Sequence, residues 1–226
     1  ISSESLVQNR HLGIHFDIAV FTNLTPEHIE SHGGFENYKK AKGILFEYLT
    51  QFPTTPEKLK IIPGLQKTII VNSDSEHANF YKKFPAEKYL GFSVKNTDGH
   101  LQAKDIQYSP EGIGFKLNNI QFDLQLKGQF DVYNSLAAIA VGESLHIPLN
   151  ISQEALSKIA VVPGRVEIIA GANYTVVVDY AYEPEEMRQL YETISRWPHK
   201  KVTQVLGPTG GGRDTARIPL LGKMAS

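Results

Sequence analysis

A polar turn with two histidines follows a short apolar run near the start of the chain. His28 and His32 lie four positions apart, with Glu27 and Glu30 beside them. In a helix, this spacing places two imidazoles on one face, as a pair of metal ligands requires. The order His-Ile-Glu-Ser-His differs from the zinc-protease pattern, in which Glu directly follows the first His. Spacing alone favours a solvated loop whose histidines cap helices, whereas the position after a buried strand favours a ligand site.

Lys42 lies at the edge of the apolar face of a helix predicted over residues 35–52. A lysine in such a place usually extends its ammonium group to solvent. Partial burial can instead lower the pKa of a lysine. A neutral amine can take up carbon dioxide, and the resulting carbamate offers two oxygens to a hard cation such as Mg²⁺. The residues alone leave both interpretations open.

Two further motifs follow predicted strands in the last third of the chain. Residues 207–214, Gly-Pro-Thr-Gly-Gly-Gly-Arg-Asp, could hold an anion at a helix N-terminus. They match neither Gly-x-Gly-x-x-Gly nor the lysine-containing phosphate loop, so a flexible turn fits equally well. Asp179 ends a predicted strand and could orient a sugar hydroxyl or a metal-bound water, or could simply cap a turn.

The elements that must position these motifs begin with an α/β pattern. Apolar runs at 17–21 and 68–72 predict buried parallel strands, with a helix over 35–52 between them. Residues 89–126 contain turn-forming sequences between candidate strands, and the alternation from Ile120 to Leu126 is typical of a half-buried antiparallel strand. We predict strands at 89–94, 103–108, 112–117 and 120–126, then a helix over 128–145. The first unit is therefore an α/β domain with an antiparallel flap.

A second unit follows a break at Val161-Val162-Pro163-Gly164, our candidate hinge. Its pattern predicts a strand at 174–179, a helix at 184–197, a strand at 202–206 and a helix from about residue 219. This order is typical of a βαβα unit with a parallel sheet. The fold class is α/β, with a second α/β domain that begins after the hinge.

Composition excludes several classes of protein. The chain has 226 residues, a formal net charge of −1 and no cysteine. Disulfides, thiol nucleophiles and thiolate metal sites are excluded, and a nucleic-acid interface is not supported. No apolar run approaches the ~20 residues that cross a bilayer, so we expect no membrane contact and a cytoplasmic location. Because the sequence opens at Ile1 without Met, we expect a piece of a longer protein.

Taken together, these segments resemble the ATP-dependent Mur ligases of peptidoglycan precursor synthesis, and most closely the branch that extends UDP-N-acetylmuramoyl-dipeptide. The matches occur in family order over almost the whole chain: Ser2-Ser3-x-x-Leu6-Val7-Gln8-x-Arg10, Phe21-Thr22-Asn23-Leu24-Thr25-x-x-His28, His32-Gly33, Tyr38-x-x-Ala41-Lys42, Gly128-x-Phe130-x-Val132-Tyr133-Asn134, Pro163-Gly164-Arg165-x-Glu167, Val178-Asp179-Tyr180-Ala181 and Arg213-Asp214.

The resemblance implies a role for each candidate residue. His28 and a carbamylated Lys42 would be catalytic and would hold Mg²⁺. ATP would contact Asn134, Arg165 and Asp179. The muramoyl-dipeptide would contact Ser2, Gln8 and Arg10, and the incoming amino acid would meet Arg213. Residues 1–163 would be part of the P-loop-type central ATPase domain, and 164–226 the first part of a Rossmann-like C-terminal domain.

The implied enzyme joins an amino acid to UDP-N-acetylmuramoyl-L-Ala-D-Glu through an acyl phosphate, with ATP and Mg²⁺. The sequence leaves the amino acid open: lysine, meso-diaminopimelate or another amine. We expect a monomer, and no ATP turnover by this piece alone, because it contains no Gly-x-x-Gly-Lys-Thr loop. Four positions depart from the family: Asp131 for Asn, Glu27 for Asp, and Tyr182-Glu183 for His-Thr.

Two alternatives remain. A related ligase of the folylpolyglutamate or cyanophycin synthetase type is disfavoured by Gln8 and Arg10, which match the muramoyl-peptide site. A non-catalytic nucleotide-binding or scaffold relative is the other alternative.

Overall fold

A parallel sheet forms the centre of the computed structural model, which describes all residues except 27–28, 96–98, 172, 208–214 and 216. Its strands lie in the order β1 (Ile18–Phe21), β2 (Thr68–Asn72), β3 (Lys88–Ser93) and β4 (Leu101–Gln102), and every neighbouring pair is parallel. All five residues of β2 are buried, as the apolar run predicts. The predicted strands at 17–21 and 68–72 are confirmed.

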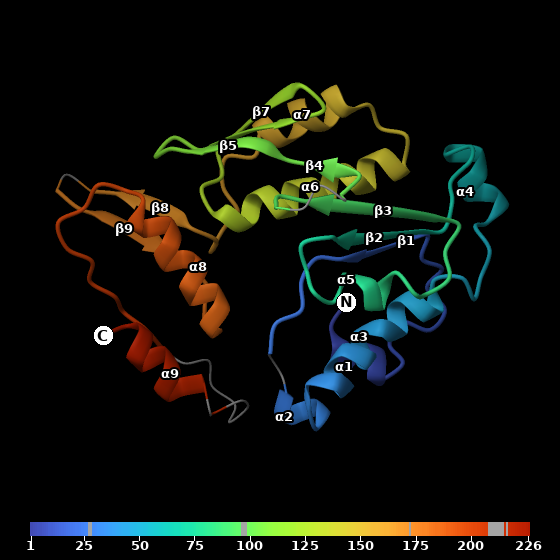
Figure 1. Cartoon of the computed structure of the whole chain (residues 1–226), viewed down its shortest axis with the longest axis horizontal. Helices are drawn as coiled ribbons and strands as arrows, with labels where there is room; N and C mark the ends of the chain where they lie inside the picture. Colours follow the sequence, from blue (N-terminus) through green and yellow to red (C-terminus); the bar gives the residue numbers. More distant parts are fainter. Residues whose placement is uncertain (27–28, 96–98, 172, 208–214, 216) are drawn as a thin grey trace.

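Helices cover both faces of this sheet (Figure 1). Ile69 and Val71 of β2 pack with α3 (Phe35–Tyr48) and α5 (Ala78–Tyr81). Ile70, between them in sequence, packs on the opposite face with α6 (Gln129–Ser144). Successive strand residues thus enter different cores, since side chains alternate across a strand. The helices predicted at 35–52 and 128–145 are present, with ends a few residues shorter.

An antiparallel flap packs over α6. It contains β5 (Lys104–Tyr108), β6 (Ile113–Leu117) and β7 (Ile120–Leu124), with α7 (Leu149–Ser157) against β7. Asn118 and Asn119 take φ angles of 48° and 64° between β6 and β7, as a two-residue hairpin turn requires. The strands predicted at 103–108, 112–117 and 120–126 are confirmed.

The assignment of residues 89–94 to the flap is wrong. They form β3, which pairs in parallel with β2 and lies inside the central sheet. A run of apolar residues does not reveal the direction of its partner strand, and the turn-forming sequence after it misled the prediction.

The C-terminal unit also differs from its prediction. β8 (Glu167–Ala170) pairs antiparallel with β9 (Thr175–Val178), and β8 was not predicted. α8 (Pro184–Ser195) is present as expected, followed by α9 (Arg217–Met224). The predicted strand at 202–206 is wrong: this segment has no regular structure, and Val205 is 99% exposed. The expected parallel βαβα unit is therefore not formed among the described residues.

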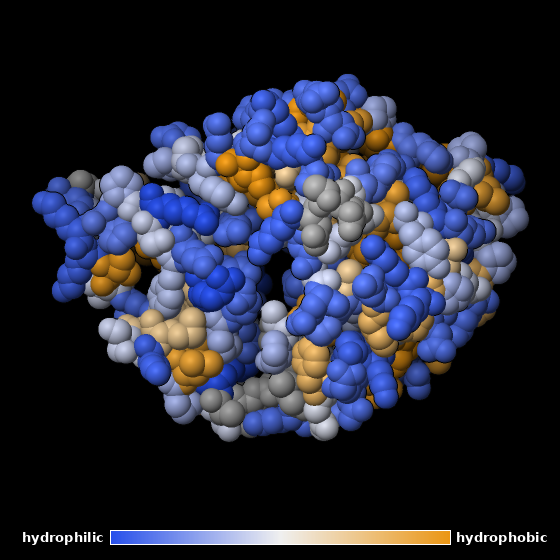
Figure 2. Space-filling model, viewed as in Figure 1, coloured by the Kyte–Doolittle hydropathy of each residue, from blue (hydrophilic) through white to orange (hydrophobic). Residues whose placement is uncertain are grey.

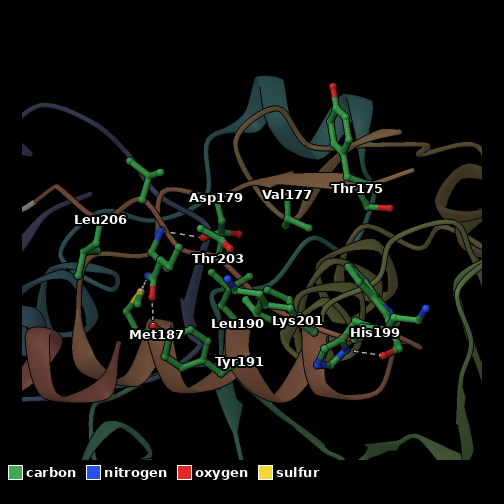
Figure 3. A pocket seen from close by; sticks show the side chains of 18 of the residues that line it. Thr175, Val177, Asp179, Met187, Leu190, Tyr191, His199, Lys201, Thr203 and Leu206 are labelled. Carbon is green, nitrogen blue, oxygen red and sulfur yellow. Dashed lines mark hydrogen bonds between the residues drawn. The ribbon is translucent and has the colours of Figure 1, made fainter. Parts of the chain in front are cut away.

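A cavity separates residues 202–206 from β9, the strand beside which we expected them to pair. It has a volume of about 1390 Å³ and lies between β9, α8 and the segment 198–207 (Figure 3). Tyr191 of α8 donates a hydrogen bond to the Gln204 side chain, which holds the segment near the helix. A strand forms only where its backbone groups find a partner, and β9 lies across the cavity.

Three short helices complete the structure: α1 (Ser3–Val7), α2 (Ile29–His32) and α4 (Pro56–Ile61). α1 begins at Ser2, whose Oγ accepts a hydrogen bond from the Ser5 backbone N–H at 3.1 Å, and it packs against α3. Among the described residues, no helix is long and apolar enough to cross a bilayer.

Candidate functional site

A cleft of about 690 Å³ opens at the carboxyl ends of the parallel strands. One wall is built by residues 22–25 after β1, residues 72–77 after β2, and the first turns of α6. The other wall comes from the C-terminal unit, with Arg165, Asp179 and the first turns of α8. Figure 2 shows a hollow between the two parts. Ligands bind at this edge of open α/β sheets, so the topology points to the cleft.

The start of α6 presents two polar side chains to the cleft. The Gly128 backbone N–H donates to Asp131 Oδ2 at 2.9 Å, so the carboxylate caps the helix. Asp131 is only 7% exposed, and burial raises its pKa to about 6, with the negative charge of Asp179 adding to the effect. Asn134 lies one turn further on and is exposed at the cleft. Its amide can both donate and accept a hydrogen bond.

The opposite wall holds Asp179 in a fixed orientation. Its Oδ2 accepts from the Val166 backbone N–H and its Oδ1 from the Ala181 N–H, both at 2.7 Å. Each carboxylate oxygen keeps a further acceptor site for a hydroxyl. Arg165 is exposed, with Nη1 3.9 Å from Glu186 Oε1. The cleft thus brings together Asn134, Arg165 and Asp179, the three residues that the family resemblance implies for ATP contact.

Gly164, in the candidate hinge, packs against and is hydrogen-bonded to the C-terminal unit. Gly164 takes a φ of +72°, and an added Cβ would lie 2.2 Å from the Tyr180 ring, so only glycine fits. Its carbonyl accepts from the Tyr180 N–H at 2.9 Å. The exposed residues 159–161 precede this turn and have no helix or strand structure, and Val162 forms an isolated antiparallel bridge with Arg165.

A second cluster joins α1, α2 and α3. Lys42 is half-buried, with Nζ 4.9 Å from the centre of the Tyr38 ring. The His32 ring lies 5.4 Å from the same tyrosine, and His32 Nε2 is 2.9 Å from Ser3 Oγ. The Ser-Ser motif and Lys42, 39 or more positions apart in sequence, therefore belong to one neighbourhood.

His28 lies outside the described residues, so its pairing with Lys42 stays a prediction. Within the part of the chain that the structure describes, no group of three or more His, Asp or Glu side chains could hold a metal ion. Lys42 as an ammonium cannot bind a cation, and only its carbamate would supply oxygens. Direct binding of a cation by Lys42 would therefore require that modification.

Three of the four residues predicted to bind substrate flank α1. Ser2 caps its N-terminus, and Gln8 and Arg10 are exposed at its other end. Arg213 lies outside the described residues. The roles of these four residues stay predictions.

The sequence interpretation missed several residues that line the cleft: Asp74, His77, Lys95 and Arg188. Asp74 comes two positions after the end of β2, so the rule that pointed to the turn after β1 could have found it. Arg188 comes from the second turn of a surface-type helix, and the sequence around it carries no such signal.

Comparison with known proteins decides the family. The Mur ligase middle domain model matches residues 1–142. The chain belongs to the Mur ligase family. Over 230 aligned residues, this Mur ligase chain is 36% identical to the UDP-N-acetylmuramoyl-L-alanyl-D-glutamate--2,6-diaminopimelate ligase of Oceanobacillus iheyensis, covering all of the chain and 45% of that protein.

Solved structures agree on the fold. One solved structure, of a ligase of the same name, aligns with the whole of this chain over 45% of its own chain, with 29% sequence identity and a TM-score of 0.71. The MurF ligase from Thermotoga maritima in complex with ADP covers 83% of this Mur ligase chain and 41% of its own, with 18% identity and a TM-score of 0.65. That likeness is one of fold alone. The chain spans less than half the length of these relatives.

Proposed function

We propose that the protein carrying this chain is an ATP-dependent ligase that adds 2,6-diaminopimelate to UDP-N-acetylmuramoyl-L-Ala-D-Glu. The observation that carries the proposal is the cleft, in which Asn134, Arg165 and Asp179 converge from two units. The choice of amino acid follows the name of the Oceanobacillus iheyensis relative, which aligns with the whole chain. The domain division at residues 163 and 164 belongs to the same proposal.

In this reaction the substrate carboxylate takes the γ-phosphoryl group of ATP, and ADP leaves. The amine of the amino acid then attacks the acyl phosphate, and phosphate leaves as the amide forms. Two anions must approach each other in the first step, so positioning and charge compensation supply most of the rate. Mg²⁺, held by His28 and the Lys42 carbamate, would neutralise phosphate charge when bound.

The chain's own residues position the nucleotide. The carboxylate of Asp179, fixed by two backbone N–H groups, would accept a hydrogen bond from a ribose hydroxyl. The Asn134 amide would pair with the adenine edge, and the Arg165 guanidinium would offset phosphate charge. Ser2, Gln8 and Arg10 on α1 would bind the muramoyl-dipeptide, and Arg213 would meet the amino acid. The two walls belong to different units, so their approach would exclude water.

The decisive experiment measures ADP release by the full-length gene product. We expect release that requires UDP-N-acetylmuramoyl-L-Ala-D-Glu and is fastest with meso-2,6-diaminopimelate. Preference for lysine would overturn the choice of amino acid alone. ADP release with a folate substrate in place of the muramoyl-dipeptide would overturn the choice of acceptor, and no ADP release with any pair would overturn the ligase assignment.

A further inference from the structure

Arg196 joins the C-terminal unit to the first unit at a point away from the chain connection. It directly follows α8 as its C-cap residue, and its Cζ lies 4.2 Å from the centre of the Tyr108 ring. Its Nη2 donates a hydrogen bond to Gln129 Oε1 at 3.0 Å. Tyr108 ends β5 of the flap and Gln129 begins α6, so one guanidinium contacts two elements of the first unit.

The two helices that this contact joins, α6 and α8, both line the cleft. Gln129 lines the cleft and is followed directly by Phe130 and Asp131, which line it too. α8 lines the opposite wall with Glu185 and Arg188 in its first turns. A 12-residue helix is a rigid rod of about 18 Å, so a contact at its C-terminal end fixes where its first turns lie.

The chemistry of the contact suits an arginine. A guanidinium can stack on an aromatic ring and still donate in its plane, which a lysine ammonium cannot do in the same way. Burial raises the pKa of the Tyr108 phenol, although the charge of Arg196 opposes the shift, so the ring stays neutral at physiological pH. The neutral ring face attracts the cation.

We propose that Arg196 is a positioning residue that sets the width of the nucleotide cleft by fastening the end of α8 to Tyr108 and Gln129. This role rests on the proposed function, since the cleft is taken as the ATP site. Arg196 is not among the residues that line the cleft, so it would act through α8 and α6. Loss of the contact leaves the packing of α8 against α6 and the chain connection at 159–162 as restraints between the two walls.

The first test measures the distance between the units without any ligand. The chain has no cysteine, so Asp123→Cys on β7 and Tyr174→Cys in the β8–β9 turn give two exposed, unique sites for spin labels. We expect one narrow distance distribution in the parent and a broader one in Arg196→Ala and in Tyr108→Leu. Arg196→Lys should be intermediate. Lys116→Ala, which removes an exposed ion pair within the flap, is the matched control and should stay narrow.

The second test uses the full-length protein. We expect Arg196→Ala to raise the KM for ATP about three- to tenfold, with kcat changed less than twofold, because a stacked and hydrogen-bonded cation of this kind contributes modestly. An unchanged distance distribution in both Arg196→Ala and Tyr108→Leu would overturn the positioning role. So would a broadened distribution with an unchanged KM. Failure of the parent to bind ATP would instead refute the proposed function, and the distance measurement would still report on the contact.

Discussion

The Tyr133 hydroxyl donates a hydrogen bond to Asp74 Oδ2 at 3.1 Å, joining the turn after β2 to the second turn of α6. The same oxygen accepts from the backbone N–H groups of Val94 and Lys95, at 2.7 and 3.0 Å. One carboxylate therefore ties together three segments that border the cleft. Tyr133 precedes Asn134 in sequence, so this contact also restrains the residue that we assign to adenine.

Tyr133→Phe should destabilise the chain by about 1.5 kcal/mol, since it removes one hydrogen bond to a charged acceptor. Asp74→Ala should cost more, about 2–3 kcal/mol, because it leaves several donors without their acceptor. Urea unfolding of the single and double variants gives the coupling energy. Tyr174→Phe, at a 69% exposed ring, is the control. Additive effects of the two substitutions would contradict a direct Asp74–Tyr133 bond.

Asp131→Asn should stabilise the chain at neutral pH. The pKa of Asp131 is raised from 3.8 to about 6, mainly by burial, so the folded state disfavours its charged form. Its favourable contribution is complete below pH 3.8 and is lost as the pH rises through about 6. The gain above that pH is on the order of 2–3 kcal/mol, and asparagine keeps an oxygen for the Gly128 N–H.

Urea unfolding between pH 4 and 8 measures this effect. The difference between Asp131→Asn and the parent should vanish near pH 4 and grow toward pH 7. The exposed Asp123→Asn on β7 serves as the control and should not show that pH dependence. A pH-independent difference at Asp131 would show that its charge is not penalised in the folded chain.

The sequence predicts the first unit well because its signals are local. The strands at 17–21 and 68–72 are apolar runs that pack against a core on each face, and their carboxyl ends mark the cleft. It predicts the second unit less well because pairing there is not local. The segment 202–206 has a strand-like composition, yet β9 pairs with β8, and the cavity of about 1390 Å³ lies between β9 and that segment.

The same difference between local and non-local signals applies to the site residues. Asn134, Arg165 and Asp179 sit in recognisable motifs, and the structure places them in one cleft. Arg196 belongs to no motif. Its proposed role depends on the Tyr108 ring and the Gln129 side-chain amide, which are 88 and 67 positions away in sequence. No spacing of residues in the sequence predicts such a contact.

Asp17 lies at the amino end of β1, opposite the cleft, and makes the stability of the folded chain sensitive to acid. Burial alone would raise its pKa, but hydrogen bonds and charge from Lys58 and Lys67 outweigh it and lower the pKa below 3.8. Lys67 Nζ lies 3.0 Å from Asp17 Oδ1 and its side chain is only 4% exposed. The stabilising contribution is present above the unfolded pKa and is lost as the pH falls through the lower, folded value.

Asp17→Asn should therefore cost about 3 kcal/mol at pH 7, because it leaves the buried Lys67 charge without its counter-ion. The difference from the parent should shrink below pH 4. Chemical denaturation from pH 3 to 8 follows both curves. Asp105→Asn, which breaks an exposed pair with Lys116, should cost less than 1 kcal/mol. Equal effects at positions 17 and 105 would contradict the buried network.

Lys42→Ala tests the proposed chemistry most directly. If a carbamate on Lys42 holds Mg²⁺, its loss should lower the rate of the full-length protein at least ~100-fold, as removal of a metal-orienting group does. Lys42→Arg should fare no better, since a guanidinium forms no carbamate, although it would keep the cation–π contact with Tyr38. Small carboxylates should partly restore Lys42→Ala, because alanine leaves room for two oxygens near the metal.

The matched control is Lys40→Ala, on the same helix but exposed. It should retain the parent rate. Thermal unfolding of each variant separates a catalytic loss from a folding defect, because Lys42→Arg should unfold close to the parent temperature. A Lys42→Arg protein with full activity would reduce the role of Lys42 to its contact with Tyr38, and Mg²⁺ would then need other ligands.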